Sequence, residues 1–122
     1  MDKREIGIWG EDTACRYIRG RGWAVLTRNY HSRYGEIDIV AQDGEYIVFV
    51  EVKTRKNTRF GMPGEYVDLR KQEKLIKTAL DYLSENDRAA RFDVAEVFYH
   101  LCGGKPVLDR VNYIENAFEV QA

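Results

Sequence analysis

Two runs of apolar, β-branched-rich residues flank Asp43-Gly44, and this stretch constrains the fold more than any other part of the chain. The runs lie on either side of this pair within residues 35–53, and both have the composition of β-strands. An Asp-Gly pair suits a tight turn, because glycine adopts positive φ without strain. The stretch predicts a β-hairpin with Asp43 and Gly44 at the centre of its turn.

The predicted register gathers ionisable side chains near the open end of this hairpin. Counting outward from the turn sets Asp38 opposite Phe49, and alternation then places Asp38, Glu51 and Lys53 on one face. Asp38 and Glu51 become diagonal neighbours, about 7–8 Å apart by backbone. The other face is entirely apolar and consists of Ile37, Ile39, Ala41, Val48, Val50 and Val52.

Two carboxylates this close repel each other unless a cation lies between them. Lys53 would neutralise one of them, whereas a divalent ion such as Mg²⁺ would use both, together with carbonyl oxygens and water. Lys53 could then orient an attacking water or stabilise charge on a phosphoryl group. The simpler alternative is a solvated strand end with a Glu51–Lys53 ion pair and Asp38 as an ordinary carboxylate. Taken alone, so short a pattern favours that alternative.

Longer strings of the sequence give these residues a context: Gly10-Glu11-Asp12, Asn29-Tyr30, Gly35-Glu36-Ile37-Asp38, Phe49-Val50-Glu51-Val52-Lys53-Thr54-Arg55, Phe92-Asp93-Val94 and Asn116-Ala117-Phe118. The set Asp38 and Glu51-Val52-Lys53 resembles the active-site signature of the PD-(D/E)XK nuclease superfamily. Over nearly its whole length the chain resembles the YraN-like family of uncharacterised bacterial proteins within that superfamily. It resembles the archaeal Holliday-junction resolvases more distantly.

The resemblance implies a restriction-endonuclease-like α/β fold with an αβββαβ core, in which helices flank a mixed sheet. It also implies metal-dependent phosphodiester hydrolysis with Mg²⁺ or Mn²⁺ as cofactor. Asp38 and Glu51, helped by the Val52 carbonyl, would hold the metal, and Lys53 would be catalytic. A helix-borne Glu11 would assist the metal directly or through water.

Two amphipathic helices are predicted. The first runs from about Ile6 to Arg19, and Glu11 lies on its apolar stripe, where a carboxylate needs a partner. The alternative for Glu11 is a helix-start acid favoured by the helix dipole. The second helix is capped by Asp68 and ends near Glu85. Its predicted buried stripe consists of Leu69, Leu75, Ile76, Ala79, Leu80, Tyr82 and Leu83.

The remaining segments are predicted from alternation and turn residues. Strands are expected at residues 23–27, 91–99 and 111–114. Residues 28–30 either continue the first of these strands or begin a polar connection to Gly35. Within that connection His31, Arg33 and Tyr34 are candidates for phosphate or base contact, and a loop is expected at residues 54–64. Asp93 and Glu96 are expected to be structural or rim carboxylates rather than ligands.

Basic side chains near the predicted site are candidates for contact with a phosphate backbone. They are Arg33, Arg55, Lys56, Arg59, Lys71 and Lys74. The alternative is a solvated charged surface. The formal net charge is −1, which argues against a general nucleic-acid coating protein and leaves local patches as the contact.

Length and composition indicate one domain over residues 1–122, with 44% hydrophobic residues to form its core. Cys15 and Cys102 are expected to be reduced, and neither the cysteines nor His31 and His100 have zinc-site spacing. No apolar leader or membrane span is expected, so a cytoplasmic protein is predicted.

The sequence therefore predicts a Mg²⁺- or Mn²⁺-dependent endonuclease acting on DNA. A branched or flapped substrate is implied by the resolvase resemblance alone. The alternatives are a non-catalytic nucleic-acid-binding module of the same fold and an RNA-directed phosphodiesterase. Cutting both strands of a junction would require a homodimer.

Overall fold

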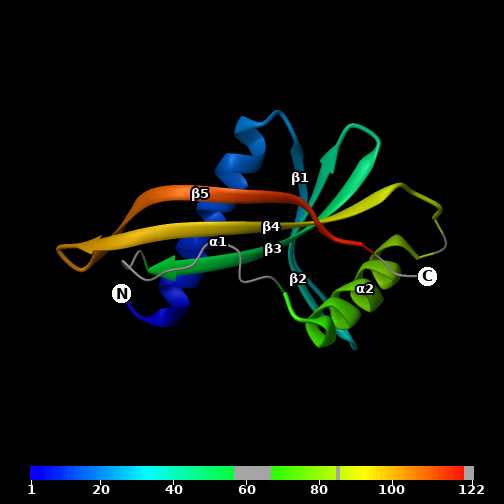
Figure 1. Ribbon diagram of the computed structural model, residues 1–122, viewed down its shortest axis with the longest axis horizontal. Coiled ribbons are helices and arrows are strands. Elements are labelled where there is room, and N and C mark those ends of the chain that lie inside the picture. The colour runs from blue at the N-terminus through cyan, green and yellow to red at the C-terminus, as the bar shows by residue number, and fades with distance from the viewer. Residues whose placement is uncertain (57–66, 85, 120–122) are drawn as a thin grey trace.

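The computed structural model describes residues 1–56, 67–84 and 86–119. The described elements, in chain order, are α1 (Lys3–Gly20), β1 (Ala24–Ser32), β2 (Gly35–Asp43), β3 (Tyr46–Lys56), α2 (Leu69–Leu83), β4 (Ala90–Cys102) and β5 (Lys105–Phe118). The strands form a five-stranded sheet in the order β1-β2-β3-β4-β5 (Figure 1). β3 and β4 are parallel and are connected through α2, whereas the other neighbours are antiparallel. The predicted fold class is confirmed: this is a restriction-endonuclease-like αβββαβ core, which β5 extends at one edge.

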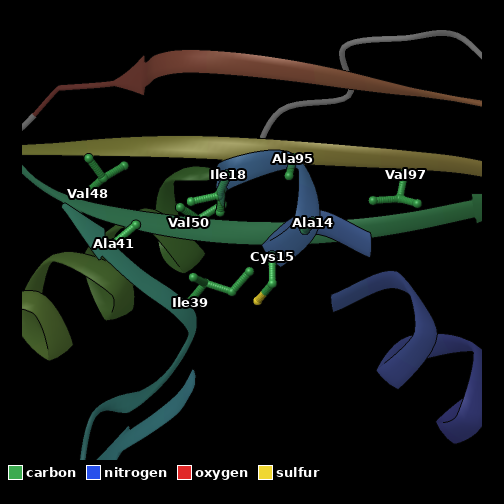
Figure 2. Close-up of a cluster of buried hydrophobic side chains, with 9 residues drawn as sticks. All are labelled: Ala14, Cys15, Ile18, Ile39, Ala41, Val48, Val50, Ala95 and Val97. Carbon is green, nitrogen blue, oxygen red and sulfur yellow. The ribbon is translucent and has the colours of Figure 1, made fainter. Parts of the chain in front are cut away.

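The two helices cover opposite faces of the sheet, because alternate residues of the central strands pack against different helices. Val48 and Val50 belong to the buried cluster that contains Ile18 of α1, whereas Phe49 belongs to the cluster that contains Leu75 of α2. Figure 1 shows the helices displaced from each other along the sheet. Figure 2 shows how the side chains on the α1 side meet: Ala14, Cys15, Ile18, Ile39, Ala41, Val48, Val50, Ala95 and Val97.

Helix α1 lies very close to β3 at Gly10. A Cβ placed on Gly10 would lie 2.0 Å from the Thr54 Oγ1 atom, a distance that no side chain tolerates. Asp2 caps the helix, and its carboxylate accepts a hydrogen bond of 2.9 Å from the Glu5 N–H. The close contact at Gly10 fixes the neighbouring Glu11 relative to β3.

The β2–β3 hairpin is confirmed, but its predicted register was wrong by two residues. Asp43 pairs with Tyr46, so Gly44 and Glu45 form the turn, and Gly44 has a φ of 57°. Arg91 Nη1 donates to Asp43 Oδ2 at 2.9 Å and thereby holds Asp43 in the strand. A shift of two residues leaves the side chains on their predicted faces, apart from that of Ile37.

Ile37 is the exception on the predicted apolar face, because it packs with the α2 cluster rather than beside Ile39. The pairing of β2 with β3 ends at Ile39 and Val50. Beyond that point the Val52 N–H donates to the Asp38 carboxylate at 2.8 Å. β2 therefore departs from β3 at Asp38, and the divergence turns Ile37 toward α2.

Four strands, β1, β3, β4 and β5, are longer than predicted, because pairing with long neighbours extends them past the periodic segments. For residues 28–30 the alternative of a continued strand is confirmed, and β1 runs on through Ser32, which was predicted as part of the connection. Residues 54–56 were predicted as a loop but continue β3 beside β4. β5 covers Lys105–Phe118 rather than residues 111–114. The rest of the predicted loop, including Arg59, lies outside the described residues.

The buried stripe of α2 is narrower than predicted. Leu69 and Leu80 are 74% and 61% exposed, so their predicted burial was wrong. The stripe that faces the sheet contains Leu75, Thr78 and Ala79. Thr78 can face the core because its hydroxyl donates to the Lys74 carbonyl at 2.8 Å.

Both cysteines are free, as predicted, with Cys15 buried and Cys102 exposed. Among the described residues, no helix has the length and apolar character needed to span a membrane.

Candidate functional site

Asp38 and Glu51 meet at the point where β2 and β3 separate. Asp38 precedes Ile39, the last β2 residue that pairs with β3, and Glu51 follows its partner Val50, so the two acids occupy the next positions on the diverging strands. Glu51 is buried. The Val52 N–H fixes the Asp38 carboxylate, so the backbone of β3 helps to orient both acids.

Burial raises the pKa of Asp38 to about 7, from an ordinary value of 3.8. The charge on Glu51 is the second cause, and Glu11 adds to the rise, while the Val52 hydrogen bond and Lys71 oppose it. A carboxyl group in this state is partly protonated at neutral pH. A cation placed beside it would favour loss of that proton.

Lys71, rather than Lys53, forms the ion pair with Glu51. The Lys71 Nζ atom lies 3.0 Å from Glu51 Oε1. Partial burial opposes a charge on Lys71, but its bond to Glu51 holds its pKa above the ordinary value. Asp68 orients this first turn of α2, because its carboxylate accepts from the Lys71 N–H at 2.8 Å. From the sequence, Lys71 was predicted only to contact phosphate. Its ion pair with Glu51 could not be predicted, because the two residues lie on different elements and no sequence motif links them.

Lys53 lies half-buried on β3, two residues from Glu51 and on the same face. Within the described parts of the chain its ammonium group forms no ion pair with an acid. The sequence alternative of a Glu51–Lys53 ion pair at a solvated strand end does not match this geometry.

Glu11 approaches from α1, on the other side of the sheet. Its Oε1 atom is buried and has no hydrogen-bond partner among the described residues. Arg28 Nη2 lies 3.8 Å away. Burial raises the Glu11 pKa, while Arg28 and a hydrogen bond with the Asn29 side chain lower it. Glu11 thus adds negative charge near Asp38 from the α1 side of the sheet.

No three His, Cys, Asp or Glu side chains within residues 1–56, 67–84 and 86–119 converge closely enough to hold a metal. The structure therefore offers a two-carboxylate site, and the Val52 carbonyl remains a predicted ligand. Hard cations such as Mg²⁺ are commonly bound by one or two carboxylates, with water and substrate phosphates as the other ligands. The donors present fit such an ion, because Asp38 and Glu51 offer hard carboxylate oxygens and the charge of Glu51 raises the Asp38 pKa even with Lys71 beside Glu51.

The predicted phosphate contacts differ in their surroundings. Arg55 is half-buried, and its Nε atom lies 3.0 Å from Oε2 of the buried Glu96, whereas Lys56 is exposed at the end of β3. Exposed basic residues also lie in the β1–β2 turn and on α2: Arg33, Lys71 and Lys74. Arg59 is outside the described residues.

Asp93 and Glu96 are structural, but both are buried within β4 rather than placed at a rim. Asp93 accepts hydrogen bonds from Arg91, from the Tyr113 hydroxyl at 2.6 Å and from the Asn116 N–H at 2.9 Å. Glu96 accepts one from the Asn112 side chain at 2.8 Å.

Comparison with known proteins gives one consistent family. The model of the group described as Uncharacterised protein family UPF0102 matches residues 10–97, a range that includes both carboxylates and α2. A UPF0102 protein of Syntrophomonas wolfei is 46% identical over 118 residues, covering 94% of this chain and 98% of its own. One of Caldicellulosiruptor saccharolyticus is 42% identical over 122 residues, covering 97% and 100%. One of Nocardia farcinica is 39% identical over 116 residues, covering 93% and 91%.

Proposed function

Since the chain belongs to Uncharacterised protein family UPF0102, whose name states no activity, we propose its function from the site itself: a Mg²⁺- or Mn²⁺-dependent nuclease that hydrolyses DNA phosphodiester bonds. The observation that carries this proposal is the paired placement of Asp38 and Glu51, which with burial raises the pKa of Asp38 to about 7. Two opposed carboxylates with too little positive charge between them suit a divalent cation.

The residues of the site would divide the work. Asp38 and Glu51 would hold the cation, with the Val52 carbonyl as a further oxygen ligand. The bound cation would polarise a phosphoryl oxygen and make a bound water more acidic. Lys53, on the same face as Glu51, would stabilise negative charge on the phosphoryl oxygens or orient the attacking water. Glu11 would accept a hydrogen bond from a water at the edge of the site.

Lys71 would have two roles, one in the metal-free site and one in the metal-bound site. Its ammonium group neutralises Glu51 at 3.0 Å, in the place where a cation would act. Once a cation takes over that role, Lys71 is free to contact a phosphate. The same ion pair favours the alternative function, a non-catalytic nucleic-acid-binding module in which Lys71 replaces the metal.

Cleavage assays test the proposal. Single-stranded, duplex, flapped and four-way DNA, and a matching RNA, are incubated with Mg²⁺, Mn²⁺ or EDTA. We expect cutting of DNA with either metal and none in EDTA, with a loss of about 100-fold or more in Asp38→Asn and Glu51→Gln. Glu45→Gln, in the exposed β2–β3 turn, is the control that should cut normally. Cutting that persists in both site variants, or in EDTA, contradicts the proposal.

A further inference from the structure

The turn between β1 and β2, Arg33-Tyr34, is held against α2. The Tyr34 N–H donates to Ser32 Oγ at 3.0 Å, and Ser32 Oγ lies 3.2 Å from Thr78 Oγ1. Gly35 lies against the same part of the helix, since a Cβ added to it would be 3.9 Å from the Lys74 Cβ. The turn is therefore placed by α2, the helix that also supplies Lys71 to the carboxylate pair.

Tyr34 presents an aromatic ring flanked by cations. The ring is 37% exposed, and its hydroxyl accepts from Arg33 Nη2 at 2.7 Å. The Arg33 guanidinium carbon and the Lys77 Nζ atom lie 4.9 and 5.9 Å from the ring centroid. A hollow beside the ring is lined by Tyr34, Lys77, Leu80 and Asp81. The exposed Leu80 gives this hollow an apolar wall that the hydrophobic core does not use.

Lysines connect this ring with the carboxylate pair. Lys71, Lys74 and Lys77 follow at three-residue spacing on α2, so they are neighbours on the helix surface. The six residues from the first to the last span about 9 Å along the helix, so the three ammonium groups can contact successive phosphates of a strand. Asp81, the acid that lines the hollow, accepts a hydrogen bond from the Tyr30 hydroxyl. The three lysines give the surface between ring and site a positive charge that suits phosphates.

We propose that Tyr34 is a stacking platform for an unpaired DNA base, in a strand whose phosphates follow Lys77, Lys74 and Lys71 toward Asp38 and Glu51. Bases inside a duplex are covered by their neighbours, so an exposed ring stacks on an unpaired or terminal base. This inference rests on the proposed nuclease function and narrows its substrate to DNA with a single-stranded segment.

Binding measured in EDTA tests the inference without cleavage. The full chain is titrated against fluorescein-labelled single-stranded, blunt duplex and flapped DNA by fluorescence anisotropy. The wild type should bind single-stranded and flapped DNA more tightly than blunt duplex. Tyr34→Ala should weaken binding to the single strand about tenfold and change binding to the duplex by less than about twofold, while Tyr34→Phe keeps the ring and the affinity.

Two further variants sharpen the test. Tyr46→Ala is the matched control, because Tyr46 is 46% exposed and also lies beside an arginine, Arg91, but in the β2–β3 hairpin; it should bind like the wild type. Lys77→Gln should lower the slope of log affinity against log salt for the single strand by about 0.7. Thermal melting establishes that each variant is folded.

The inference is overturned if the wild type shows no preference for unpaired DNA, or if folded Tyr34→Ala binds it normally or loses duplex binding equally. These results are separable from the cleavage assay. Metal-dependent cutting with normal single-strand binding by Tyr34→Ala removes the stacking platform and leaves the nuclease. Tyr34-dependent binding without any cutting removes the nuclease and leaves a single-strand-binding surface.

Discussion

Folding disfavours the ionised form of the Asp38 carboxyl group. Its pKa rises from 3.8 to about 7 through burial and the charge of Glu51. Between those pH values the folded chain binds a proton at Asp38 that the unfolded chain releases. In the metal-free protein this group therefore contributes stability at low pH that is lost as pH rises through about 4 to 7.

Asp38→Asn removes the charge and keeps an oxygen that can accept from the Val52 N–H. We expect the free energy of unfolding of the metal-free variant to exceed that of the wild type at pH 8, by on the order of 1–3 kcal/mol. At pH 4 the two should be nearly equal, because Asp38 is then protonated. Urea unfolding in EDTA at both pH values measures this, and a variant less stable than the wild type at pH 8 contradicts it.

Lys71 neutralises the buried Glu51, so its removal should matter more without metal than with it. Lys71→Gln should lower the free energy of unfolding in EDTA by about 1 kcal/mol, a modest value because the lysine is half-exposed. Millimolar Mn²⁺ should reduce that loss. Lys74→Gln, one turn along α2, is the control and should change stability by less than about 0.5 kcal/mol. An equal loss with and without Mn²⁺ would show that Lys71 and the cation do not share a role.

At the scale of elements, the contact between α1 and β3 determines where Glu11 lies. Gly10→Ala would place a Cβ 2.0 Å from Thr54 Oγ1 and must push the helix from the strand. We expect a loss of about 1–3 kcal/mol in the free energy of unfolding. Gly7→Ala is the matched control in the same helix, because an added Cβ meets nothing within 4 Å; it should gain about 0.5–1 kcal/mol. Thermal or urea unfolding compares them, and equal effects would contradict the close contact.

The types of most elements could be predicted from periodicity and turn residues, but their ends could not. Asp43-Gly44 correctly indicated a hairpin. Its register depends on Arg91, which holds Asp43 in β2 from a strand far along the chain. Likewise, the sequence left open whether Tyr30 continues a strand or begins a connection. In the structure it belongs to β1, and its ring centroid lies 5.1 Å from that of Tyr82 on α2. Contacts between distant segments therefore determine both the hairpin register and the position of Tyr30.

For the molecule as a whole, the site joins segments that only the packing of both helices brings together. The sequence could place Asp38 and Glu51 on one face, because they belong to a single hairpin. The sequence could not show that Lys71 pairs with Glu51 or that Glu11 stands on the opposite side of the sheet, since each depends on how a helix docks. The resemblance to nucleases suggested the chemistry that we propose, and the fold shows how the side chains are arranged.

The central claim is that Asp38 and Glu51 share one divalent cation, and a calorimetric titration of the metal-free protein with Mn²⁺ tests it most directly. We predict one ion per chain, bound more tightly at pH 8 than at pH 6 because binding displaces the Asp38 proton. Asp38→Asn and Glu51→Gln should each abolish binding, and Glu45→Gln should leave it unchanged. Unchanged Mn²⁺ binding in both site variants, or no binding by the wild type at millimolar Mn²⁺, would contradict the claim.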